Sequence, residues 1–201
     1  LQGQVGPERF EKITRVLAHY QLPAEWVAKM KVWATVMTLS VPPPETGFFM
    51  DFSLSLRAAG SGLRVVGLET LEEQLSFLEN MPMEQQLALL DQALLEYDLV
   101  QEVHDRMVDN YLAGDLQALA READSHLDLL DGKARDYFVA EVIDARNLRM
   151  LRAMLPLLDK NRAFIAVGAL HLPGESGLLA LLRKQGYRLE PLALPFNAEK
   201  L

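Results

Sequence analysis

Cysteine is absent from the 201 residues of the sequence. This absence excludes disulfide bonds, thiolate metal ligands and a cysteine nucleophile, but it does not identify the compartment, because a chain of this length can bury a core without crosslinks. Long apolar runs are also absent. The longest nearly uncharged stretch, 32–44, is too short to cross a bilayer and ends in three prolines. We therefore expect no transmembrane segment.

Basic residues are scarce: 20 lysines and arginines stand against 28 acidic residues, for a net charge of −8. Because phosphate neutralisation needs a basic surface, this balance argues against a nucleic-acid partner.

Residues 1–20 show no basic region followed by an apolar one, so no signal peptide is visible. Half of the residues are apolar and 24% are charged, which is typical of a folded globular protein.

The negative charge is concentrated in the middle of the chain. Residues 69–131 hold sixteen acidic side chains against two arginines, a net of −14, whereas the flanks together carry +6. Apolar residues recur at helical spacing there, so we predict a helical acidic sub-region over 83–131. Four of its carboxylates share another helix face: Asp98, Glu102, Asp105 and Asp109. Such carboxylates can bind a divalent metal, but a solvated face is the favoured interpretation.

Three short apolar segments are typical of strands: 63–68, 163–168 and 187–192. Helical periodicity dominates most of the remaining chain. We therefore predict an α/β fold in which residues 1–201 form a single, helix-rich domain around a small mixed β-sheet. Trp26 and Trp33 belong to an apolar helical stripe, which we interpret as core or as a surface for self-association.

His171 is a candidate for chemistry because it follows the predicted strand 163–168 in a loop before a helix. Sites in open α/β sheets lie at such strand ends. Gly168 allows a close turn beside it, and Gly174 lies in the same loop. The imidazole is suited to metal binding or to general-base catalysis, although it can equally close the loop by hydrogen bonding.

Glu69 occupies the corresponding position after the predicted strand 63–68. A carboxylate and an imidazole at neighbouring strand ends make a metal site or an acid–base pair, whereas the structural alternative for Glu69 is a charge stabilised by the helix dipole. Arg146 lies within a helix among apolar residues. It is suited to orienting Glu69 or to holding a substrate carboxylate, and an ordinary ion pair is the alternative.

Four sequence runs resemble the TraB/PrgY/GumN family, to which the TIKI Wnt-inactivating proteases belong. They are GLETxEEQL from Gly67, GDLxxLA from Gly114, RNxxM from Arg146 and VGALHLPGExGLLxLLRxxGY from Val167. The resemblance implies a mixed α/β fold and, by analogy with TIKI, a metal-dependent protease with two Gly-x-x-His motifs, a glutamate and an arginine. These features fall here on Gly168 with His171, on Glu69 and on Arg146, supported by the loop residues Gly67, Gly174 and Glu175.

The first Gly-x-x-His motif of the family is absent. His19, His104 and His126 lack a glycine three residues before them, and Leu1 is not an initiator methionine. We therefore expect an N-terminally truncated domain that carries one histidine of a pair.

The leading functional hypothesis is a hydrolase of the TIKI type that acts on peptides or small proteins. His171 and Glu69 would bind Mn²⁺ or a similar divalent ion, with Glu69 as ligand or base and Arg146 as the charge-stabilising group. The alternative is a protein of the cell envelope that binds and sequesters a peptide or pheromone without cleaving it. The resemblance also implies a bacterial, periplasmic protein.

Overall fold

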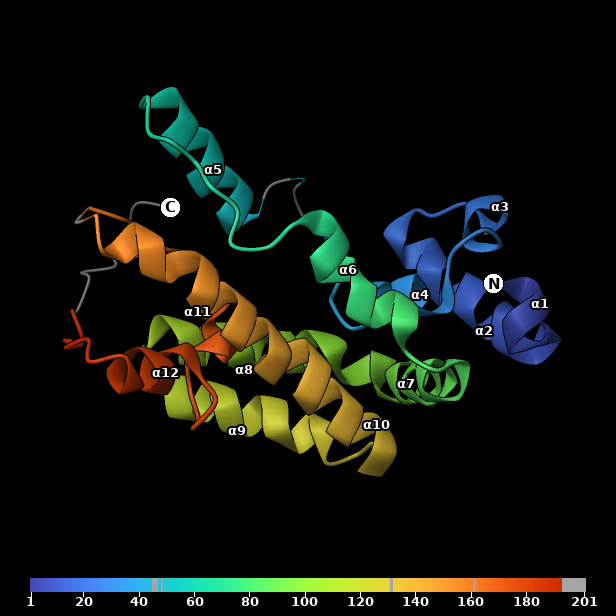
Figure 1. The fold of residues 1–201 in the computed structure, drawn as a ribbon. Helices are drawn as coiled ribbons and strands as arrows, with labels where there is room; N and C mark the ends of the chain where they lie inside the picture. Colours follow the sequence, from blue (N-terminus) through green and yellow to red (C-terminus); the bar gives the residue numbers. More distant parts are fainter. Residues whose placement is uncertain (45–46, 48, 131, 161, 193–201) are drawn as a thin grey trace.

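A computed structural model describes residues 1–44, 47, 49–130, 132–160 and 162–192 (Figure 1). Its first half consists of short helices. They are α1 (Gln2–Val5), α2 (Pro7–Leu17), the 3₁₀ turn η1 (Ala18–Tyr20), α3 (Ala24–Val27), α4 (Val32–Leu39), α5 (Met50–Gly60) and α6 (Leu71–Asn80). Pro7 begins α2, as expected for a residue that fits the first helical position.

The second half contains the longer helices. They are α7 (Met83–Glu96), the 3₁₀ turn η2 (Tyr97–Leu99), α8 (Val100–Leu112), α9 (Leu116–Leu127), α10 (Gly132–Tyr137), the π-helical stretch η3 (Phe138–Asp144), α11 (Ala145–Leu158), the 3₁₀ turn η4 (Ala169–His171) and α12 (Leu178–Lys184). Helices α10, η3 and α11 follow one another without a break, and Pro156 lies inside the last turn of α11.

The predicted α/β fold is wrong. The described residues contain no β-strand, and the three segments predicted to be strands run as irregular chain. Their apolar side chains are largely exposed: Leu63 is 64% exposed, Val65 is 53% exposed and Phe164 is 83% exposed. A β-branched run shows only a local preference, whereas a strand also needs a neighbouring strand to complete its hydrogen bonds. No such pairing occurs in the described part of the chain.

The acidic region 83–130 consists of several helices and is not one long helix. The 3₁₀ turn η2 separates α7 from α8, and Gly114 with Asp115 reverses the chain into α9. The Asp115 carboxylate caps α9 by accepting a hydrogen bond from the Ala118 N–H at 2.8 Å. Helices α8 and α9 consequently run side by side (Figure 1). Residue 131, the last residue of the predicted sub-region, lies outside the described residues. The four carboxylates at 98, 102, 105 and 109 are all exposed.

Buried side chains form three clusters. The first joins α1 to α4 with α7 around Ile13, Leu17 and Leu90, each completely buried. The second joins α11 to α12, with Leu68 and Val167 packed against it, and therefore holds the candidate site residues near one another. The third centres on Phe77, Leu78 and Val142.

The two tryptophans do not lie in one environment. Trp26 is 62% exposed, whereas Trp33 packs against the cluster formed by Phe77, Leu78 and Val142. Self-association through the surface around Trp26 and Trp33 stays a prediction.

Among the described residues, no helix is long and apolar enough to span a membrane.

Candidate functional site

Glu69 and Arg146 form a largely buried ion pair. The Arg146 Nε–H donates to both carboxylate oxygens of Glu69 at 3.1 Å each, and its Nη2 donates to Oε2 at 2.8 Å. The side chains are 9% and 13% exposed. A second guanidinium approaches the same carboxylate, with the Nε of Arg149 3.8 Å from Oε1. Glu69 thus faces two positive charges, and burial strengthens their Coulomb attraction while making the loss of either partner costly.

The start of α6 fixes the position of Glu69. Thr70 is the N-cap residue: its hydroxyl accepts a hydrogen bond from the Glu73 N–H at 3.1 Å, and the Glu73 carboxylate accepts one from the Thr70 N–H at 2.8 Å. A threonine followed three residues later by a glutamate is the typical sequence pattern of such a capping box. Gly67 contributes as well, because a Cβ there would lie 3.0 Å from the Glu69 carbonyl oxygen.

His171 ends the η4 turn and hydrogen-bonds to α11. Its Nδ1 lies 2.8 Å from the Oδ1 of Asn147, a residue with no exposed surface. The Asn147 amide Nδ2 donates to the carbonyl oxygen of Ser176 at 2.9 Å. Because a carbonyl oxygen only accepts, the amide nitrogen must face Ser176 and Oδ1 must face His171. His171 therefore carries its proton on Nδ1, which leaves the Nε2 lone pair available to a ligand or a proton.

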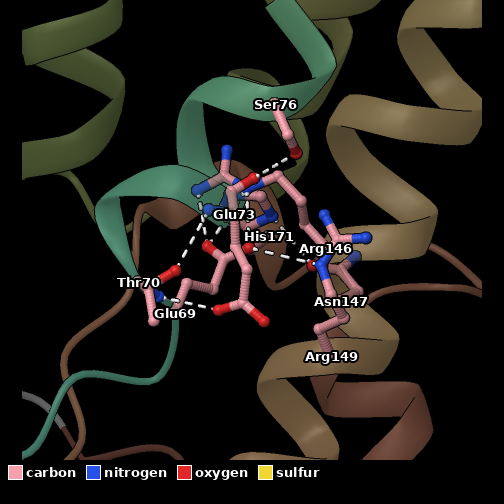
Figure 2. A network of polar contacts seen from close by, with 8 residues as sticks. All are labelled: Glu69, Thr70, Glu73, Ser76, Arg146, Asn147, Arg149 and His171. Atoms are coloured by element: carbon pink, nitrogen blue, oxygen red, sulfur yellow. Dashed lines mark hydrogen bonds and ion pairs between the residues drawn. The ribbon is translucent and has the colours of Figure 1, made fainter. Parts of the chain in front are cut away.

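The environment of His171 favours its neutral form. Burial lowers its pKa below the usual 6.5, and the Arg146 guanidinium lowers this pKa further, while the Glu69 carboxylate opposes both effects. The imidazole is consequently neutral at pH 7. Figure 2 shows Glu69, Arg146 and His171 converging from the start of α6, from α11 and from η4. We refer to Glu69, Arg146, Asn147, Arg149 and His171 as the Glu69 cluster.

The glycines of the loop differ in what they allow. Gly168 has φ −58°, and a Cβ there would lie 3.6 Å from His171 Cδ2, so the turn does not require glycine. Gly174 has φ +84°, a conformation that glycine adopts readily. The tightest approach is at Gly177, where a Cβ would lie 1.9 Å from the Pro173 carbonyl oxygen. Glu175 is exposed, and its backbone carbonyl accepts a hydrogen bond from Lys184 Nζ at 3.2 Å.

Sequence reasoning did not assign Asn147 and Arg149 to the site. Asn147 lies on the apolar stripe of its helix, between Ile143 and Met150, and a polar side chain in such a stripe is a usable signal because burial demands hydrogen-bond partners. Arg149 is three residues after Arg146 and therefore shares its helix face. No sequence pattern indicated the role of Ser176, because this residue accepts the hydrogen bond from Asn147 through its backbone carbonyl, which every residue type carries.

The described residues do not make a complete metal centre. Among them, no three His, Asp or Glu side chains gather closely enough to hold a metal ion. His171 offers one nitrogen, and both oxygens of Glu69 accept hydrogen bonds from Arg146. A catalytic zinc site typically uses three protein ligands, so a divalent ion would need donors beyond these two.

Comparison with known proteins connects this cluster to metalloproteases. The chain is 26% identical to metalloprotease TIKI2 of Xenopus tropicalis over 89% of its length and 26% identical to metalloprotease TIKI2 of Danio rerio over 84%. It is 25% identical to a metalloprotease TIKI homolog of Nematostella vectensis over 84%. The chain spans about 40% of the length of these relatives. No solved structure matches it significantly.

The family resemblance read from the four sequence runs is confirmed. The model of the TraB/PrgY/gumN family matches residues 1–191, which includes the whole Glu69 cluster. This protein belongs to the TraB/PrgY/gumN family.

Proposed function

We propose that the chain carries part of the active site of a hydrolase that cleaves peptides. The observation that supports this most strongly is a neutral imidazole beside a buried carboxylate and two guanidinium groups, drawn from distant parts of the sequence. A purely structural ion pair does not need a neighbouring histidine whose Nε2 can accept a proton. Hydrolysis, in contrast, needs both a base and a positive group. Membership in a family with relatives named metalloproteases supports the same reaction class.

In this proposal, His171 accepts a proton at Nε2 from the attacking water, because its pKa is below neutrality and its Nδ1–H is held by Asn147. It then returns this proton to the leaving amine as the C–N bond breaks. Arg146 and Arg149 stabilise the negative charge that develops on the peptide oxygen. Glu69 positions Arg146 through its paired hydrogen bonds. If a divalent ion such as Mn²⁺ binds at this site, the His171 Nε2 would be a ligand instead of the base, and the ion would supply the activation of the attacking water.

A panel of fluorogenic peptides, incubated with the protein in Mn²⁺, Co²⁺ or EDTA, tests the proposal. We expect turnover to fall at least about 100-fold in His171→Ala, as is typical for the loss of a general base. A matched control is His104→Ala, which removes an exposed histidine of α8. Arg146→Lys should also lose activity, because lysine cannot reproduce the forked hydrogen bonds to Glu69. Equal turnover by His171→Ala and His104→Ala would refute the catalytic role.

The second candidate is peptide binding without cleavage. It is favoured by the engagement of Glu69 with two arginines and by the lack of a third ligating side chain near His171 in the described residues. This candidate predicts saturable binding of a basic peptide with no product, and binding that weakens as salt rises, because residues 69–131 carry a net charge of −14. Turnover that disappears in His171→Ala would exclude it.

A further inference from the structure

A cavity of about 470 Å³ lies between α8, α9, η3 and the segment 170–176. Its volume falls in the range of small-molecule sites. Apolar side chains from three helices form most of its wall, among them Val103 and Met107 from α8, Ala123 and Leu127 from α9, and Phe138 and Ile143 from η3. An apolar group of a ligand would therefore be removed from water here, which favours its binding.

The charged groups at this cavity have one sign. Glu96, Asp124 and Asp144 line it, and none of the lysines or arginines in the described residues does. Its basic side chain is His126, which lies 3.5 Å from Glu96 and 3.6 Å from Glu122. An anionic ligand would meet three carboxylates and neither lysine nor arginine among the lining residues, whereas a cation would be attracted.

Asp144 supplies a specific anchor. One of its carboxylate oxygens, Oδ1, is buried from solvent and has no hydrogen-bond partner in the described residues. Because Asp144 itself lines the cavity, its carboxylate can accept a charge-assisted hydrogen bond from a cationic N–H of a ligand. Asp144 ends η3, the π-helical stretch, and such stretches occur frequently at functional sites because they displace side chains from the regular helical pattern.

We infer that this cavity binds a small apolar or aromatic group that carries an ammonium or guanidinium ion, with the apolar part against α8 and α9 and the cation on Asp144. The inference does not depend on the proposed hydrolase. It does bear on the neighbouring site, because Leu170, Pro173 and Ser176 line the cavity and belong to the segment that carries His171. An occupant would thus contact the residue whose carbonyl holds Asn147.

Titration with 4-phenylbutylamine tests the inference, with neutral 4-phenylbutanol and anionic 4-phenylbutanoate as matched probes. The protein is labelled with ¹³C at its methionine methyl groups, and Met107 reports binding from the cavity wall; Met107→Leu assigns its signal. We expect a saturable shift of the Met107 methyl with the amine, and an affinity about tenfold or more above that of the alcohol, the size of a charge-assisted hydrogen bond. The carboxylate probe should bind more weakly than the alcohol.

Variants locate the cation. Asp144→Asn should weaken amine binding about tenfold and leave alcohol binding unchanged, whereas Asp109→Asn, an exposed carboxylate of α8 away from the cavity, should change neither. Ala123→Phe should abolish binding of both probes by filling the space. Because Ala123→Phe can unfold the protein, the test rests on the comparison of amine binding by Asp144→Asn and by Asp109→Asn. Equal amine and alcohol affinities, or equal effects of the two Asp→Asn variants, would overturn the inference, as would the lack of a saturable Met107 shift.

Discussion

Asn147 determines which nitrogen of His171 carries the proton. It is completely buried, accepts from His171 Nδ1 at 2.8 Å and donates to the Ser176 carbonyl at 2.9 Å. Asn147→Leu keeps the approximate size of the side chain but removes both hydrogen bonds. The Ser176 carbonyl belongs to an exposed residue and can recover a bond from water, whereas the His171 nitrogen is partly buried beside the new leucine.

The expected cost of Asn147→Leu follows from this difference. One buried donor left without an acceptor destabilises a protein by about 1–3 kcal/mol, so we expect a loss of about 2 kcal/mol in the free energy of unfolding. For a chain of this size that corresponds to a fall in Tm of about 4–8 °C. Without the Asn147 oxygen, the Nδ1–H form of His171 also loses its stabilisation, and the proton should shift toward Nε2.

Two measurements check this prediction. Urea unfolding gives the loss of stability, with Arg152→Leu, an exposed position of the same helix, as the control. ¹⁵N NMR of the histidine side chains at pH 7.5 distinguishes the two neutral forms of His171 directly. A variant that keeps the proton on Nδ1, or one that is no less stable than Arg152→Leu, would contradict our account of the Glu69 cluster.

Three further predictions concern the same region. Arg146→Met should cost about 3 kcal/mol by leaving Glu69 buried without its main partner, and adding Glu69→Gln should cost less than the sum of the single changes; additive effects in urea unfolding would contradict the pairing. Because the pKa of His171 is lowered on folding, the unfolded chain binds this proton more readily, so the free energy of unfolding should fall as the pH drops through about 6.5. In His171→Gln this part of the pH dependence should vanish. If the stability of the variant and that of the unchanged protein depend on pH in the same way, the prediction is wrong. Thr70→Ala should cost about 1 kcal/mol through loss of the α6 cap, and Ser55→Ala, at an exposed position of α5, close to nothing in the same thermal melts.

Local sequence signals account for a helix boundary where a specific contact ends or begins the helix. Pro7, the Thr70 to Glu73 spacing and Gly114 with Asp115 each act through backbone groups a few residues away, so their effect is visible in the sequence. The same local reasoning failed for 163–168. Apolar, β-branched residues favour an extended chain, but whether that chain becomes a strand depends on a partner that local sequence does not contain.

The sequence by itself identified the family and placed Glu69, Arg146 and His171 in its characteristic runs, because these runs are fixed patterns of neighbouring residues. Only the tertiary structure decided how these side chains meet. Contacts such as Arg146 to Glu69 and His171 to Asn147 join residues 77 and 24 positions apart, and their geometry depends on how α6, α11 and η4 pack. The cavity beside Asp144 likewise exists only because several helices and the 170–176 segment surround one space, and no short stretch of sequence encodes it.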